Sequence, residues 1–105
     1  MGFMKRYKVI ILDTAEEDLM NLSLFLFNVM SIEGAWKYHQ CMLHEIQSLS
    51  ILADIFPLSP HLDIQRYHPL ARHMVSHNKR WVYIFHIDND TVLVDRIIPA
   101  KLITK

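Results

Sequence analysis

The second half of the chain carries five of its seven histidines, whose side chains can transfer protons or bind metal ions near neutral pH: His61, His68, His73, His77 and His86. A structural zinc site needs cysteine or glutamate ligands beside such histidines at set spacings, and none of these pairs has them. The single Cys41 lies in an apolar helical pattern, which favours a buried, inert thiol over a nucleophile. The sequence therefore predicts no metal site and no cofactor.

The last of these histidines stands in a segment that predicts a β-hairpin. Residues 81–88 and 91–98 are rich in β-branched and aromatic side chains, and Asn89 and Asp90 between them suit a two-residue turn. Counting outward from that turn places Phe85 opposite Val94, Tyr83 opposite Arg96 and Trp81 opposite Ile98. A three-residue loop would shift this pairing by one residue.

The two faces of the predicted hairpin differ in bulk. One collects the larger side chains, and we expect the core beneath it: Trp81, Tyr83, Phe85, Ile87, Val92, Val94 and Ile98. The other is smaller and more mixed: Val82, Ile84, His86, Leu93, Asp95 and Ile97. This second face is too apolar for ordinary exposure to solvent, so Val82, Ile84 and Leu93 are candidates for binding a partner.

The elements before the hairpin follow from capping and periodicity. Residues 7–12 read as a strand, and Thr14 with Glu17 has capping-box spacing for a helix over residues 15–30. Ser31 can cap a second helix over residues 32–53, followed by a loop to about residue 70 and a strand over residues 72–75. The order β-α-α-β-β-β predicts an α+β fold, with a helical hairpin packed on one face of a small, mainly antiparallel sheet.

The first predicted helix has more apolar side chains than one buried stripe requires. The stripe comprises Leu19, Leu22, either Phe25 or Leu26, and Val29. Three apolar side chains lie off it, namely Met20, Leu24 and Phe27. These three are candidates for binding another protein, either a partner or a second copy in a homodimer.

Composition sets the class of protein. The chain has 105 residues, about half of them apolar, which predicts one domain over residues 1–105. Eleven basic residues balance eleven acidic ones, so no long-range positive field indicates a nucleic-acid partner. The apolar runs are too short for a signal peptide or a membrane span, and a lone cysteine fits a reducing cytoplasm. The sequence therefore predicts a cytoplasmic protein without a membrane partner.

Several weak motifs in a fixed order give the chain a family resemblance. They are Tyr7-Lys8-Val9-Ile10, Ala15-Glu16-Glu17-Asp18-Leu19, Phe56-Pro57, the strand Tyr83–Asp88, and Val94-Asp95-Arg96-Ile97-Ile98. In this order the chain resembles the RelE/ParE superfamily of type II toxins, which includes plasmid stabilisation proteins. The resemblance implies a prokaryotic toxin that is neutralised by a cognate antitoxin, whose extended or helical tail wraps the toxin's grooves.

The resemblance leaves two activities open. RelE-like members cut messenger RNA on the ribosome and carry an arginine at the position of Val82, where cations stabilise charge on phosphorus. The frequent His-Gly-Arg after the last strand is Pro99-Ala100-Lys101 here. These departures favour ParE-like inhibition of DNA gyrase; a non-toxic interaction module is a further alternative. If the chain is an endonuclease, the candidate catalytic residues are Arg72, His73, Lys79, Arg80, His86 and Lys101.

Arg96 and Tyr83 are expected to be structural. The hairpin count places Arg96 beside Tyr83 on the bulky face, where an unpaired charge is unfavourable. We therefore expect Arg96 to bind a helix carboxylate such as Glu45, or to stack on the ring of Tyr83.

Overall fold

The computed structural model describes residues 5–103. Its strands are β1 (Lys8–Ile11), β2 (Arg72–Val75), β3 (Trp81–Asp88) and β4 (Thr91–Pro99). Its helices are α1 (Asp13–Val29), α2 (Ile32–Leu52) and the short α3 (Leu62–Gln65), with 3-10 turns η1 (Ala53–Ile55) and η2 (Ala100–Leu102). The order β-α-α-β-β-β and the α+β class agree with the prediction.

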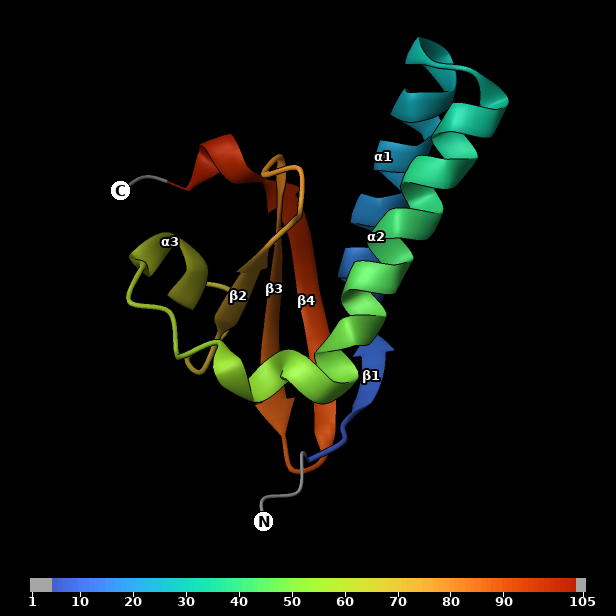
Figure 1. Cartoon of the computed structure of the whole chain (residues 1–105). Helices are drawn as coiled ribbons and strands as arrows, with labels where there is room; N and C mark the ends of the chain where they lie inside the picture. Colours follow the sequence, from blue (N-terminus) through green and yellow to red (C-terminus); the bar gives the residue numbers. More distant parts are fainter. Residues whose placement is uncertain (1–4, 104–105) are drawn as a thin grey trace.

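The four strands form one sheet in the order β1-β4-β3-β2. β1 runs parallel to β4, and the other neighbours are antiparallel. α1 and α2 form an antiparallel hairpin that covers one face of the sheet and projects beyond the ends of the strands (Figure 1). α3 lies on the opposite face (Figure 1).

The larger core fills the space between the helical hairpin and the sheet. α1 contributes Ala15, Leu19, Leu22 and Leu26, and α2 contributes Ala35, Met42, Ile46 and Leu49. Tyr83, Phe85, Val92 and Val94 meet them from the sheet. The predicted stripe on the first helix is wrong at its end, because Val29 lies beyond the sheet and is 58% exposed.

The two predicted helix caps have different outcomes. Ser31 caps α2 as predicted, because its Oγ accepts a hydrogen bond from the Gly34 N–H at 3.0 Å. The capping box at Thr14 is wrong. α1 begins at Asp13 without a side-chain cap, and the Thr14 hydroxyl donates to the Asp95 carbonyl oxygen at 2.8 Å. This bond fastens the start of α1 to β4.

A β-bulge changes the predicted hairpin register halfway along. The two-residue turn is confirmed, since Asp88 pairs with Thr91 and Phe85 with Val94, and Asn89 adopts a positive φ of 57°. Asp95 is then the extra residue, so Ile84 pairs with Arg96 and Tyr83 with Ile97. The predicted pairs Tyr83–Arg96 and Trp81–Ile98 are therefore wrong. Ile97 joins the larger core and Ile98 the opposite face.

The second face of the sheet is covered by the chain itself. The segment predicted as a plain loop contains α3, and its Ile64 packs with Ala71, Val82, Ile84 and Ile98 in a smaller core. Val82 and Ile84 are 3% and 0% exposed, and Leu93 is half-buried. The prediction that Val82 and Ile84 bind a partner is therefore wrong, because the chain itself buries both side chains.

Candidate functional site

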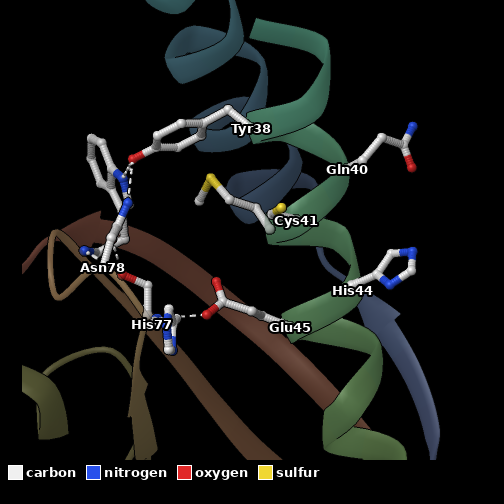
Figure 2. Close-up of a pocket in the computed structure, with 10 residues that line it drawn as sticks. Tyr38, Gln40, Cys41, His44, Glu45, His77 and Asn78 are labelled. Atoms are coloured by element: carbon white, nitrogen blue, oxygen red, sulfur yellow. Dashed lines mark hydrogen bonds between the residues drawn. The ribbon is translucent and has the colours of Figure 1, made fainter. Parts of the chain in front are cut away.

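A cleft of about 540 Å³ lies between α2 and the turn that joins β2 to β3. Tyr38 and Glu45 reach from α2 toward the turn, whereas Gln40 and His44 point away from it (Figure 2). Cys41 also lines the cleft and is exposed, so the prediction of a buried thiol is wrong. The remaining lining residues are Met42, Ser76, His77, Asn78 and Trp81.

Hydrogen bonds to the Tyr38 hydroxyl connect α2 to the residues on the other side of this cleft. The Tyr38 hydroxyl oxygen accepts from Trp81 Nε1 at 2.7 Å and from Asn78 Nδ2 at 2.8 Å. The turn itself is held by Ser76, whose Oγ accepts from the Trp81 N–H at 3.0 Å and donates to Asn78 Oδ1 at 2.7 Å. Trp81 is therefore fixed at the mouth of the cleft.

Glu45 links α2 both to the turn and to β3. Its Oε1 accepts from the Tyr83 hydroxyl at 2.6 Å, and its Oε2 accepts from the His77 N–H at 2.6 Å. Burial, followed by the bond to Glu45, raises the pKa of Tyr83 far above its ordinary value of 10.0. Tyr83 thus stays protonated near neutral pH and serves as a buried hydrogen-bond donor.

A second cleft of about 390 Å³ lies on the other side of Trp81, between α1 and the end of β4. Its lining includes Leu22, Phe25, Ile97 and Pro99, with Asp18 and Asn21 as the polar members. Trp81 lines both clefts. We call the two clefts together the groove.

The projecting part of the helical hairpin presents large apolar side chains to solvent. Among the predicted partner-binding residues, Met20 is 64% exposed, Leu24 58% and Phe27 44%. Phe25, Val29, Met30, Ile32 and Trp36 extend this exposed apolar surface. We call these eight residues the hairpin surface. Isolated exposed apolar residues are ordinary, whereas eight large ones on one projecting helical hairpin favour an interaction site.

Three of the six candidate catalytic residues gather at one corner of the sheet. Lys79 and Arg80 belong to the turn before β3, and the Ala100 N–H donates to the Arg80 carbonyl oxygen at 2.8 Å, which brings Lys101 beside them. All three are exposed, and no ion pair within residues 5–103 joins them to an acid. We call Lys79, Arg80 and Lys101 the basic corner.

The other three candidates lie away from that corner, on the paired strands β2 and β3. Arg72 Nη1 donates to the Phe56 carbonyl oxygen at 2.7 Å, which fits a structural role. His86 Nδ1 lies 2.7 Å from Asp95 Oδ2, and the ring of His68 stacks on His86 with centroids 3.7 Å apart. His73 lies beside His61, with ring centroids 5.8 Å apart. Within residues 5–103, no three histidine, cysteine or acidic side chains are placed to hold a metal ion.

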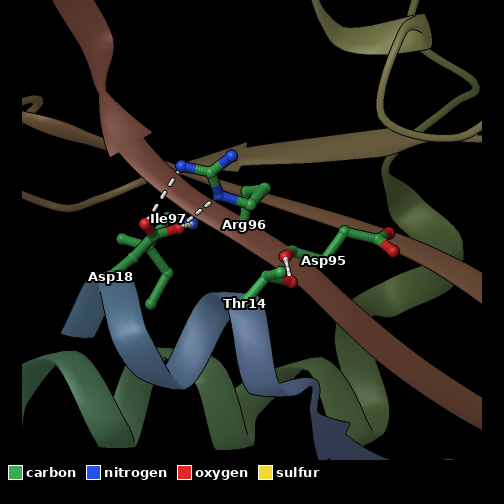
Figure 3. A network of polar contacts seen from close by, with 5 residues as sticks. All are labelled: Thr14, Asp18, Asp95, Arg96 and Ile97. Atoms are coloured by element: carbon green, nitrogen blue, oxygen red, sulfur yellow. Dashed lines mark hydrogen bonds and ion pairs between the residues drawn. The ribbon is translucent and has the colours of Figure 1, made fainter. Parts of the chain in front are cut away.

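Arg96 binds a helix carboxylate, but the predicted partner is wrong. Its Nε and Nη2 donate to Asp18 on α1 at 2.6 and 3.0 Å, and the Ile97 N–H also donates to Asp18 at 3.0 Å (Figure 3). The guanidinium lies 5.5 Å from the ring of Tyr67 rather than against Tyr83. The bulge moved Arg96 off the bulky face, and β1 ends opposite Val94, so the free edge of β4 lets the side chain reach α1.

The sequence did not reveal the clefts around Trp81. Tyr38, Asn78 and Trp81 meet only in the folded chain, and Tyr38 is 43 positions away from Trp81. One signal was available: Glu45 lies three positions after Met42 and four before Leu49, so a carboxylate borders the buried face of the second helix. Such a carboxylate needs donors from the sheet.

Comparisons with known proteins support the fold. No protein-family model matches the chain, and no curated protein matches it. No helix among residues 5–103 is long and apolar enough to cross a membrane. Among solved structures, the chain is similar to one described as the chromosomal ParDE TA system from P. aeruginosa, with a TM-score of 0.75 and 16% identity. The match covers 90% of this chain and 96% of that chain. The chain therefore shares its fold with a chain of that solved structure.

Proposed function

We propose that residues 1–105 form one RelE/ParE-like domain that is the toxin component of a type II toxin–antitoxin module in a prokaryotic cytoplasm. The observation that carries this proposal is the fold shared with a chain of a ParDE system over 90% of this chain. The toxin arrests growth, and its cognate antitoxin relieves the arrest. Such a module would stabilise a plasmid or chromosomal region that encodes it.

The hairpin surface and the groove on both sides of Trp81 are the proposed binding site of the antitoxin. The lining of the groove combines apolar side chains with polar ones such as Glu45 and Asn78, and Phe25 belongs to both the groove and the hairpin surface. An amphipathic or extended segment of a partner would bury both surfaces. Alternatively, a second copy of this chain binds the hairpin surface and forms a homodimer.

The proposed mechanism is binding and inhibition of a macromolecular target such as DNA gyrase. Val82 supports this choice: it lies where cleaving relatives carry a catalytic arginine, and it is buried in the smaller core. His86 is 9% exposed and bound to Asp95, so its ring offers little access to a phosphodiester.

The basic corner supports a second candidate function, a ribosome-dependent messenger RNA endonuclease. Lys79, Arg80 and Lys101 could together contact phosphate groups, and the exposed imidazole of His77 belongs to the same turn. A non-toxic interaction module is the third possibility, and it predicts no growth arrest.

Induced expression without antitoxin tests the proposal. We expect growth arrest, relief of the arrest by the small protein encoded beside this chain, and inhibited supercoiling by purified gyrase. Unchanged growth at verified soluble expression would contradict the toxin assignment. Arrest with intact supercoiling and codon-positioned cleavage of messenger RNA would instead establish the endonuclease.

A further inference from the structure

The cleft between α2 and the turn that joins β2 to β3 is lined by a single formal charge, that of Glu45, and we call it the Glu45 cleft. Its other lining residues carry no formal charge at pH 7 when histidine is counted as neutral. Lys79 and Arg80 follow on the same turn, but neither is among the residues that line the cleft. Within residues 5–103, no ion pair joins Glu45 to a basic side chain. The charge of Glu45 is therefore not balanced by a cation from that part of the chain.

Two uncharged donors hold the carboxylate of Glu45 in place. Its Oε1 accepts from the Tyr83 hydroxyl and its Oε2 from the His77 N–H, both at 2.6 Å. An ionised carboxylate can accept about four hydrogen bonds, so these two bonds use roughly half of its capacity. Because Glu45 is already held and half-buried in the folded chain, a cation that binds it gains electrostatic attraction with little further ordering or desolvation of the carboxylate.

Two aromatic residues share the lining of the cleft with this carboxylate, Tyr38 and Trp81. Tyr38 and Glu45 both reach from α2 toward the turn (Figure 2), and the bond from Trp81 Nε1 to the Tyr38 hydroxyl holds the two rings together at 2.7 Å. The faces of tryptophan and tyrosine rings attract cations. Met42 also lines the cleft and offers an apolar contact to the methylene stem of a long basic side chain. The lining is thus complementary to a cation on an apolar stem.

We propose that the Glu45 cleft binds a basic side chain, arginine or lysine, of the antitoxin segment that occupies the groove. The identity of the partner rests on the proposed function, whereas the preference for a cation follows from the lining of the cleft. The guanidinium or ammonium group donates to the carboxylate of Glu45 and lies against Trp81, and the methylene stem packs on Met42. An apolar anchor in the same place would desolvate Glu45 further without a counter-ion, which is unfavourable.

Titration with n-butylguanidinium chloride tests the cleft without any partner protein. This probe carries the guanidinium group and part of the stem of an arginine, and n-butylurea is its uncharged analogue. The NMR signal of the Trp81 indole N–H reports binding, and Trp36→Phe assigns it because the chain has two tryptophans. We expect the guanidinium to bind ~3- to 10-fold more tightly than the urea at matched ionic strength. Glu45→Gln should abolish this preference.

Two control variants separate the charge of Glu45 from its structural role. Tyr83→Phe removes one hydrogen bond to the carboxylate but keeps its charge, so the preference for the guanidinium should remain. Glu33→Gln removes an equal charge from an exposed position of α2 outside the cleft and should also leave the preference unchanged. The proposal is overturned by equal affinities for the two probes, by no shift with either probe, or by an unchanged preference in Glu45→Gln. If Glu45→Gln does not fold, the comparison of the two probes on the unaltered chain decides.

A second experiment identifies the basic side chain in the antitoxin. Each arginine and lysine of the small protein encoded beside this chain is replaced by methionine, and its affinity is measured for the unaltered chain and for Glu45→Gln. We expect one replacement to weaken binding to the unaltered chain about 10-fold or more and to have much less effect on Glu45→Gln. Binding in which no replacement couples to Glu45 would overturn this inference and leave the toxin assignment intact. Failure of that protein to bind at all would instead contradict the proposed function, and the probe titration would still test the cleft.

Discussion

Asp18 connects helix and sheet more densely than any other acidic residue that the structure describes. Two oxygens accept three hydrogen bonds, two from Arg96 and one from the Ile97 N–H just after the bulge. Asp18→Ala should lower the free energy of unfolding by about 1.5–3 kcal/mol, because a partly buried guanidinium loses its acceptor. Denaturant unfolding measures the change. Glu16→Ala, at an exposed position two residues earlier on α1, is the control and should change it by less than ~0.5 kcal/mol. A similar effect in both variants would contradict the role of Asp18.

Tyr83 makes the stability of the protein sensitive to alkaline pH. Its pKa is raised in the folded chain and is near 10.0 when unfolded, so this contribution is complete below pH 10 and is lost as pH rises above it. At pH 11 the loss from this residue is about 1.4 kcal/mol. Urea unfolding at pH 8 and pH 11 should show this extra loss in the unaltered chain but not in Tyr83→Phe. Equal slopes against pH in the two proteins would refute it.

At the scale of elements, the strands and helices were predictable because their signals are local. The Asn89–Asp90 turn, the Ser31 cap and the buried faces of both long helices follow from neighbouring residues. The bulge at Asp95 was not predictable from the hairpin alone. It is supported by Thr14 and Asp18 on α1, which lie more than 70 positions away in sequence. The covering of the second face by Ile64 likewise depends on a loop without a helical pattern long enough to detect.

The hairpin surface should tolerate charge in the free protein but not in a complex. Leu24 and Phe27 are exposed, so Leu24→Glu or Phe27→Glu should change the free energy of unfolding by less than ~0.5 kcal/mol. Burial of the new carboxylate in an interface should weaken antitoxin binding by at least ~10-fold. Isothermal titration and thermal melts measure the two effects.

Asn28→Glu is the matched control for these variants, because it adds the same charge to an exposed polar position of α1. Its antitoxin affinity should fall less than that of Phe27→Glu. Loss of the melting transition in Leu24→Glu would show that Leu24 belongs to the core. Unchanged affinity in both apolar variants would place the antitoxin elsewhere.

For the whole molecule, the basic corner decides between inhibitor and nuclease. We expect no cleavage of messenger RNA when the protein is incubated with translating ribosomes, as read by primer extension. If cleavage does occur and the corner carries it, Arg80→Ala and Lys101→Ala should each slow it by roughly 10²- to 10³-fold. Lys37→Ala, an exposed lysine on α2, is the control. Val82→Arg is not a useful gain-of-function test, because it would bury a charge in the smaller core.

The pairing of β1 with β4 also constrains the order of events during synthesis. Lys8 aligns with Thr91, so the first strand has no partner until the chain has grown by another 83 residues, from position 8 to position 91. At translation rates of about 5–20 residues per second, this interval lasts roughly 4 to 17 s. Until then α1 and α2 have been synthesised, but β4, which lies between β1 and β3 in the sheet, has not. The sheet of this protein is therefore complete only after β4 has been synthesised, and a partner made beforehand would be present when the sheet closes.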